Sequence, residues 1–457
     1  MTRRLWAALA VAALLGVGAA SATAAPRFER IKGFDEPRTL AKYDRVGILK
    51  VGKKRAPNVL VLNPGTSASA AYFAPLAETV TRAAPDWQVW AVERRENLLE
   101  DHSVADEAKA GDATPQRLFE YYLGHLTDES VTDHFEFIPD SEVGFAKRWG
   151  MRTAVGDLRR VVRAARKGGR HVVVGGHSLG GTITTAYATW DFGGTPGARG
   201  LRGLVFIDGG SGAPGIGRKK ARRALEELDE GSPWLTFGGI PAPFAGLFNI
   251  VGAELVKLEP DAPARFGDWP LLPEELRAPF PVTTEAGYGY ALDTATSPRG
   301  LVAAQAHLGE LAATGDPRPW DDAGELTPIQ RYADMFAGTG LEGLDGTAWY
   351  HPQRLTIDGR TVAGGNAYPA QRIMGVDAIH GDELPRRLRI YAFGASLGGQ
   401  RVLDAATALA RQSGIPRRRL TLVNRARTYS HNDPNSAAPR NAFVRHLLPF
   451  LERVSKP

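Results

Sequence analysis

Seven short apolar runs, rich in β-branched residues, recur along the chain with helical stretches between several of them. Runs that are apolar at nearly every position are typical of strands buried on both faces of a parallel sheet. The predicted strands are 46–51, 59–63, 88–93, 171–175, 203–208, 388–394 and 420–424. The pattern therefore predicts an α/β protein with a mostly parallel sheet and helices on both faces.

Two stretches show the spacing of amphipathic helices. In residues 153–167, apolar side chains recur at intervals of three and four while arginines fill the other side, and a Gly-Gly pair follows directly. Glycine is a common helix terminator. Residues 441–454 repeat the apolar spacing and predict a closing helix near the end of the chain.

The alternation of strands and helices is interrupted over about 96–150 and about 209–385. Long segments between sheet strands are usually functional unless they are disordered, and the second segment is too apolar for disorder. Its aromatic residues include Trp234, Phe237, Phe244, Phe248, Trp269, Tyr288, Tyr290, Trp320, Trp349 and Tyr350. We predict a core formed by 25–208 and 386–457, with 209–385 as an inserted cap or lid.

The first two dozen residues differ from the rest of the chain. A basic pair at 3–4 precedes an apolar stretch of 16 residues, 5–20, and small residues fill 22–24. This is the pattern of a secretory signal peptide, with cleavage predicted after Ala24. The alternative, a retained membrane anchor, requires about 20 apolar residues. We therefore expect a secreted or extracytoplasmic protein without a stable membrane anchor.

Composition narrows the classes of function. The 457 residues are 43% hydrophobic and 23% charged, as in ordinary globular proteins. The absence of cysteine excludes disulfides, a thiol nucleophile and a cysteine-ligated metal. The net charge of +6 is too weak and too dispersed to indicate a nucleic-acid partner.

A candidate nucleophile follows the apolar run 171–175. Residues 176–180 read Gly-His-Ser-Leu-Gly, and a helical stretch comes next. This places Ser178 on a sharp strand-to-helix turn that lifts its hydroxyl clear of the sheet. The two glycines let strand and helix approach closely, and the Leu179 backbone N–H is placed to bind a developing oxyanion.

This turn, in its strand and helix context, resembles the α/β-hydrolase superfamily, whose members with a Gly-His-Ser-x-Gly turn are mostly esterases, lipases, thioesterases and related acyl-transfer enzymes. The resemblance covers about 46–208 and about 388 to the C-terminus, and excludes both interruptions. It implies a nucleophile, an acid and a histidine in that chain order, with no cofactor and no metal.

A second G-x-S-x-G lies at 394–398 and makes Ser396 a competing nucleophile. The superfamily has two or three strands after its nucleophile. Three predicted strands follow Ser178 but only one follows Ser396, so we predict Ser178 as the nucleophile. Ser396 is expected in a tight turn near the rim of the pocket.

The resemblance places the catalytic histidine at His431, between the last predicted strand and the closing helix. His177, beside the nucleophile, is expected to pack or hydrogen-bond behind the turn. His102 is expected in a solvated loop, with a place in the pocket lining as the alternative. The resemblance also implies a second oxyanion donor in the loop 63–69, namely the backbone N–H of Thr66, although Pro64 stands where the family often has histidine.

The acid is harder to assign, because the usual position after strand 388–394 contains no carboxylate. Some superfamily members carry the acid one strand earlier, where this chain has Asp208. We predict Asp208 as the acid, with a purely structural role in capping the turn that precedes the inserted segment as the alternative. Asp404 is the main competitor, and Asp433 is too near His431 in sequence to orient it easily.

Together these features predict a secreted serine hydrolase that cleaves a carboxylic ester. The aromatic cap favours a lipophilic, small-molecule or lipid-like substrate, unless those side chains only form the core of the cap. Two other readings remain open at this point. One is a serine peptidase of the same fold, and the other is a non-catalytic binding protein on this scaffold.

Overall fold

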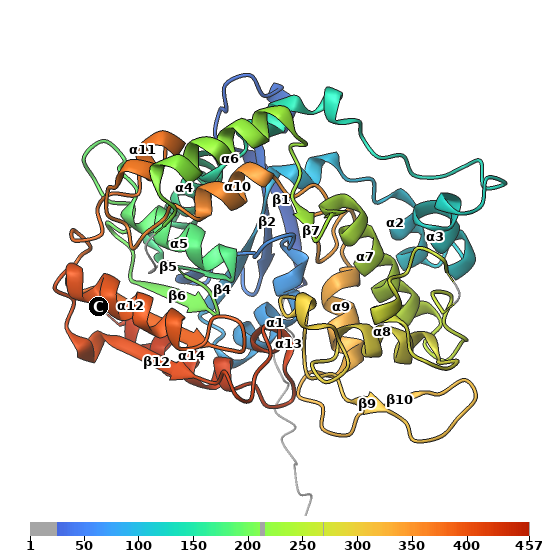
Figure 1. Cartoon of the computed structure of the whole chain (residues 1–457). Coiled ribbons are helices and arrows are strands. Elements are labelled where there is room, and N and C mark those ends of the chain that lie inside the picture. The colour runs from blue at the N-terminus through green and yellow to red at the C-terminus, as the bar shows by residue number, and fades with distance from the viewer. Residues whose placement is uncertain (1–24, 211–214, 268, 457) are drawn as a thin grey trace, which may run out of the picture.

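The computed structural model describes residues 25–210, 215–267 and 269–456, so the predicted signal peptide lies outside the described residues. An eight-stranded sheet crosses the larger part of the molecule, in the order β1-β2-β4-β3-β5-β6-β11-β12 (Figure 1). Its strands are β1 Arg27–Lys32, β2 Arg45–Val51, β3 Asn58–Asn63, β4 Trp87–Glu93, β5 His171–His177, β6 Gly203–Ile207, β11 Arg389–Gly394 and β12 Leu420–Asn424. The pairs β1–β2 and β2–β4 are antiparallel, and the others are parallel.

The predicted fold class is confirmed, and all seven predicted strands are present with ends shifted by at most two residues. The strand that was not predicted is β1, at the edge of the sheet. Only Phe28 and Ile31 of β1 are partly buried, and its other side chains are exposed. Phe28 and Ile31 pack on opposite faces of the sheet, and a strand with only two apolar side chains lacks the continuous apolar run by which the inner strands are recognised.

The sheet is covered on both faces because successive side chains of a strand point in opposite directions. Leu60 and Leu62 of β3 join one core with helices α1 (Ala74–Ala83) and α14 (Ala442–Ser455). Val59 and Val61 join a second core with α4 (Met151–Ala165), α5 (Leu179–Thr189) and α12 (Gln400–Gln412). The helices predicted over 153–167 and 441–454 are α4 and α14.

The long segment after β6 is divided between two places. Helices α6 (Arg218–Glu230), α10 (Gln353–Gly359) and α11 (Pro369–Met374) lie over α4 and α5 (Figure 1). The other helices of this segment pack with α2 and α3 in a second lobe, at the right of Figure 1. The second lobe contains α2 Ser103–Ala110, α3 Pro115–Tyr122, α7 Ala242–Leu258, α8 Thr284–Leu292 and α9 Ile329–Ala337. Two short hairpins also lie in this segment, namely β7 Thr236–Phe237 with β8 Ile240–Pro241, and β9 Glu310–Leu311 with β10 Trp320–Asp321. The remaining short α-helix, α13 (Asp433–Ser436), precedes α14.

Most aromatic side chains that suggested a lipophilic pocket pack against one another in the second lobe. The ring pairs are Trp234–Tyr350, Phe244–Trp269 and Phe248–Phe266, with centroids 5.1, 6.2 and 5.1 Å apart. They belong to a hydrophobic core that also takes in α2 and α3. These side chains therefore stabilise the lobe and give no support to a lipophilic binding pocket.

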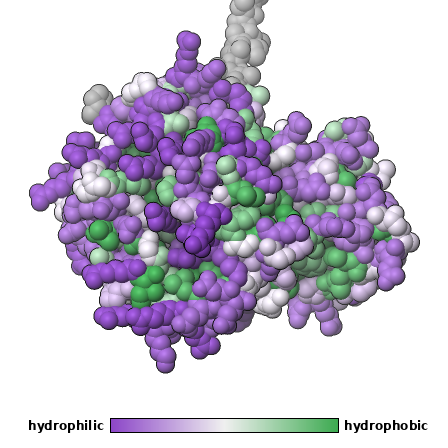
Figure 2. Space-filling view, turned by 90° about the horizontal axis from the view of Figure 1, so that it is seen from above, coloured by the Kyte–Doolittle hydropathy of each residue, from purple (hydrophilic) through white to green (hydrophobic). Residues whose placement is uncertain are grey.

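The surface carries few large apolar side chains. In the space-filling view of Figure 2 the visible face is mostly hydrophilic, with hydrophobic residues in small patches. The well-exposed large apolar residues of the described ranges are Leu40, Phe237, Ile240, Leu271 and Ile379. None of the helices in those ranges is both long and apolar enough to cross a membrane.

Glu254, in the apolar helix α7, is a buried acid whose side chain should make stability depend on pH. Burial raises its pKa from 4.5 to about 8. The positive charges of Lys109 and Lys257 oppose this rise, and the negative charges of Asp345 and Asp106 add to it. At a pH between 4.5 and about 8, Glu254 is ionised in the unfolded chain but still protonated in the folded chain. Folding stability should therefore fall as the pH rises through this range.

We expect Glu254→Gln to remove this part of the pH dependence. The Tm of the variant minus that of the parent should therefore increase from pH 5 to pH 8 in thermal unfolding. Glu227→Gln, on the exposed face of α6, is the matched control and should show no such trend. A Tm difference for Glu254→Gln that stays constant with pH would contradict the prediction.

Candidate active site

Ser178 occupies the sharp turn between β5 and α5. Its backbone angles are φ 54° and ψ −123°, a conformation that non-glycine residues adopt rarely and that persists only when the surroundings enforce it. A Cβ on Gly176 would lie 2.2 Å from the carbonyl oxygen of Gly180, so the strand and helix meet as closely as the sequence predicted. The turn presents the half-buried side chain of Ser178 to a cleft.

Asp208 and His431 meet in a buried hydrogen bond. Asp208 directly follows β6, and its Oδ2 lies 2.6 Å from Nδ1 of His431. Both side chains are at most 1% exposed. Because a carboxylate accepts, Nδ1 carries the proton of this bond, which leaves Nε2 of a neutral imidazole as a proton acceptor.

The second G-x-S-x-G motif binds the carboxylate of Asp208. Three backbone N–H groups donate to Oδ1, from Ala395 at 2.6 Å, Gly398 at 2.9 Å and Gly399 at 3.1 Å. The N–H of Leu397 donates to Oδ2 at 3.2 Å. Burial alone would raise the pKa of Asp208, but its hydrogen bond and charge interaction with His431 and the N–H of Ala395 outweigh burial and lower it. Asp208 is therefore held as an anion.

The competing residues lie elsewhere. Ser396 is exposed in the loop that surrounds Asp208. Asp404 is exposed on α12 and accepts a hydrogen bond from Gln400. Asp433 is buried, and its Oδ2 accepts from the backbone N–H of Ser430 at 2.6 Å, so it shapes the loop that carries His431. Of the three candidate acids, the structure brings only Asp208 to the His431 ring.

His177 lies directly against His431, with ring centroids 4.2 Å apart. Its Nε2 donates to the carbonyl oxygen of His431 at 2.9 Å, and the Tyr72 hydroxyl lies 3.1 Å from its Nδ1. Burial and the neighbouring His431 hold the pKa of His177 well below its usual range, so the ring is neutral. His177 thus hydrogen-bonds behind the turn, as the sequence predicted.

Ser178 Oγ and His431 are not joined by a hydrogen bond within the described part of the chain. Hydrogen bonds between a nucleophile and its base are often long or poorly aligned in the absence of substrate. Rotation about the Cα–Cβ bond of Ser178 moves its hydroxyl without changing the fold. The position of the hydroxyl is therefore adjustable, whereas the Asp208–His431 pair is fixed.

The loop 63–69 passes close to Ser178. A Cβ on Gly65 would lie 3.1 Å from Cβ of Ser178, so the loop backbone approaches Ser178 where only glycine fits easily. Within the described residues, the backbone N–H groups of Thr66 and Leu179 donate to no protein acceptor. Both donors remain available for a ligand.

Arg94, which the sequence reasoning did not single out, holds this loop. Its guanidinium donates to the carbonyl oxygens of Pro64, Gly65 and Ala68 at 3.1, 3.2 and 3.1 Å. Its Nε pairs with Glu96 at 2.5 Å, and both side chains are buried. The sequence did contain a signal for this contact, because Arg94 directly follows the predicted strand 88–93. The carboxyl ends of neighbouring parallel strands meet at one edge of the sheet, which brings Arg94 close to the loop after strand 59–63.

The cleft at Ser178 has a volume of about 280 Å³. It lies between the start of α5, the residues after β6 and the start of α12. Its lining residues are Ser178, Thr182, Asp208, Gly209, Gly210, Leu397, Gly398, Arg401, Val402 and Ala405. The cleft is small and mixed in polarity, and none of the second-lobe aromatic residues lines it.

No protein-family model matches the chain, and no curated protein matches it. Similar solved structures include a candidate lipase from Sulfolobus solfataricus, 14% identical, with 94% of each chain covered and a TM-score of 0.48. A thermostable carboxyl esterase from Bacillus coagulans is 13% identical, over 94% of this chain and 99% of that one, with a TM-score of 0.40. A haloalkane dehalogenase from Bradyrhizobium elkani is 10% identical, over 94% and 99%, also at 0.40. These values are too low to carry a function to this chain; its α/β-hydrolase fold is given by its own strand order.

Proposed function

We propose that this protein, with its α/β-hydrolase sheet, is a serine hydrolase that cleaves carboxylic esters through an acyl-enzyme on Ser178. The observation that carries the proposal is the buried Asp208–His431 hydrogen bond of 2.6 Å beside a serine held at φ 54°. This conformation places the Ser178 side chain at the tip of the turn, and a buried imidazole paired with a fixed carboxylate is suited to act as a base.

In the proposed reaction, Nε2 of His431 takes the proton of Ser178 as Oγ attacks the ester carbonyl. Asp208 stabilises the imidazolium that forms. The N–H groups of Thr66 and Leu179 donate to the oxyanion of the tetrahedral intermediate. The C–O bond to the alcohol then breaks, and His431 returns the proton to the alcohol. Water repeats these steps on the acyl-enzyme and releases the acid.

The cleft favours a small acyl group. Its volume of about 280 Å³ is just below the range of about 300–1,000 Å³ that is usual for small-molecule sites. Leu397, Val402 and Ala405 supply apolar surface, while Arg401 lies at the same cleft. We therefore infer that short-chain esters are better substrates than long lipids, which narrows the lipophilic preference expected from the aromatic composition.

Two measurements test the proposed function on the purified protein. A fluorophosphonate should label it, because such probes react with an activated serine. A panel of p-nitrophenyl esters of increasing chain length and of aminoacyl nitroanilides should show turnover on the short esters. Absence of both labelling and turnover would favour a non-catalytic scaffold, and turnover confined to the nitroanilides would favour a peptidase.

We also propose that the protein is exported after cleavage near Ala24, on the pattern of residues 1–24. Protein recovered from the culture medium should begin at or next to Ala25 in N-terminal sequencing. A cell-bound form that still begins at Met1 would argue against export.

Arg94 provides a prediction about the oxyanion loop. Replacing it with lysine keeps a positive charge beside Glu96 but removes donors to the loop carbonyls. Because the loop amide acts on charge that develops in the transition state, we expect kcat to fall by about 10- to 100-fold with KM nearly unchanged. Steady-state kinetics on a short ester measures both, with the Tm as a check on folding. An unchanged kcat in folded Arg94→Lys would show that the loop keeps its shape without this clamp.

A further inference from the structure

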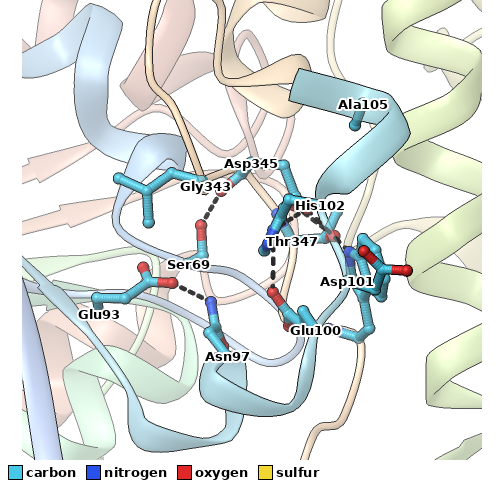
Figure 3. A network of polar contacts seen from close by, with 12 residues as sticks. Ser69, Glu93, Asn97, Glu100, Asp101, His102, Ala105, Gly343, Asp345 and Thr347 are labelled. Atoms are coloured by element: carbon cyan, nitrogen blue, oxygen red, sulfur yellow. Dashed lines mark hydrogen bonds and ion pairs between the residues drawn. The ribbon is translucent and has the colours of Figure 1, made fainter. Parts of the chain in front are cut away.

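Three titratable side chains meet at the boundary between the sheet and the second lobe. Glu100 and His102 lie between the short helix at Arg95–Leu99 and α2, and Asp345 lies in the segment after α9. We call these three residues the Glu-His-Asp cluster (Figure 3). The expectation of a solvated loop at His102 was wrong, because its side chain is only 9% exposed and faces the two carboxylates. None of the three residues lines the cleft at Ser178.

The distances from His102 to its two carboxylate neighbours match the spacing of ligand atoms in a zinc site. Nε2 of His102 lies 3.3 Å from Oε2 of Glu100 and 3.1 Å from Oδ2 of Asp345. All three atoms fall within 4.8 Å of one another. Tetrahedral zinc with bonds of about 2.0–2.1 Å places neighbouring ligand atoms about 3.3 Å apart, and imidazole with carboxylate is a common donor set for it.

The other contacts orient these atoms as ligands. Glu100 accepts from the backbone N–H of Trp349 through Oε1, at 2.8 Å. This leaves Oε2, which is buried, without a well-formed hydrogen bond and directed toward His102. Asp345 accepts from Thr347 through Oδ1 and from the Trp349 indole through Oδ2 at 2.9 Å. Outer hydrogen bonds of this kind fix the direction of metal-binding carboxylates.

The surroundings of the cluster hold an excess of buried acids. Burial raises the pKa of Glu100 to about 7, with His102 opposing and Asp345 adding to the rise. Burial and then Glu100 raise the pKa of Glu93 to about 8. Burial would lower the pKa of His102, but its bonds with Asp345 and Glu100 raise it to about 10. A metal ion bound between Glu100 and Asp345 would take the place of the proton on Nε2 of His102.

We propose that Glu100 Oε2, His102 Nε2 and Asp345 Oδ2 bind a divalent transition-metal ion of the zinc type. The imidazole nitrogen disfavours calcium and magnesium, which prefer oxygen ligands. A water molecule can complete the coordination.

The ion would have a structural effect on the oxyanion loop. The backbone carbonyl of Asp345 accepts from the Ser69 hydroxyl, and the Ser69 N–H donates to Gly346 at 3.2 Å. The N–H of Ala348 donates to Ser67 at 3.0 Å. An ion that joins Asp345 to residues 100–102 would therefore fix the segment on which the oxyanion loop is supported. The proposal does not depend on the proposed hydrolase activity, because metal binding is measured by itself.

The test uses untagged, chelator-stripped full-length protein and zinc alone. Equilibrium dialysis with elemental analysis should find one zinc per chain, and excess zinc should raise the Tm by a few degrees. Calcium and magnesium should do neither. Parent protein that binds no zinc at millimolar concentration would overturn the proposal, whatever the variants do.

Two variants assign the site. His102→Gln and Glu100→Gln should each weaken zinc binding by about 100-fold or more. His380→Gln is the matched control, because His380 also lies between two carboxylates, 3.3 Å from Asp191 and 2.9 Å from Glu383, and should bind zinc as the parent does. One zinc per chain in a folded His102→Gln protein would place the ion elsewhere and overturn the assignment.

Discussion

Replacing Ser178 with alanine should abolish labelling by a fluorophosphonate and lower kcat for a short ester by about 10⁶-fold. The hydroxyl is the atom that forms the covalent bond in the proposed reaction, and no neighbouring side chain can replace it. Alanine fits the position sterically, because Ser178 already tolerates φ 54° with a Cβ. The variant should therefore fold, which circular dichroism and the Tm would verify.

Ser396→Ala is the matched control, since it removes the serine of the second G-x-S-x-G motif. Ser396 is exposed, and the loop binds Asp208 through backbone N–H groups, which alanine retains. We expect labelling to persist and kcat to stay within about threefold of the parent, as for a surface substitution. Labelling lost in Ser396→Ala but kept in Ser178→Ala would reverse the assignment of the nucleophile.

The buried part of the sheet was predictable because burial on both faces leaves a strong local signal. Each of the seven predicted strands carries a run of apolar residues, whereas β1 has only Phe28 and Ile31 and was not predicted. The role of the long segment after β6 was harder to predict from the sequence. Aromatic composition alone does not distinguish a ligand pocket from a core, and the pairs such as Phe248–Phe266 show that these rings form a core.

The candidate site was predictable where one short stretch contains the whole signal. The turn at Ser178 is of this kind, as is the position of His431 after the last strand. The clamp at Arg94 is different, because it binds carbonyl groups 26 to 30 residues away in the chain. The backbone N–H groups that bind the Asp208 carboxylate are even farther away in the sequence, by 187 to 191 residues. Backbone donors leave no trace in side-chain identity, so only the folded chain reveals them.

The hydrogen bonds from these backbone N–H groups lead to a specific prediction for Asp208→Asn. An asparagine has one oxygen to accept from the four backbone N–H groups and from Nδ1 of His431, and its amide N–H₂ must face one of these donors. If the amide faces His431, the imidazole must accept at Nδ1 and carry its proton on Nε2, where it can no longer act as a base. We therefore expect a folded variant whose kcat falls by about 10²- to 10⁴-fold.

Asp404→Asn is the matched control for this change, because it is the same substitution on an exposed residue that contacts Gln400 and not His431. Its kcat on a short ester should stay within about tenfold of the parent. Fluorophosphonate labelling gives a second readout, since the probe needs an activated serine but no water-driven second step. Labelling should be slow in Asp208→Asn and normal in Asp404→Asn. The opposite ranking in both assays would assign the acid to Asp404 and leave the buried Asp208–His431 pair as a structural contact.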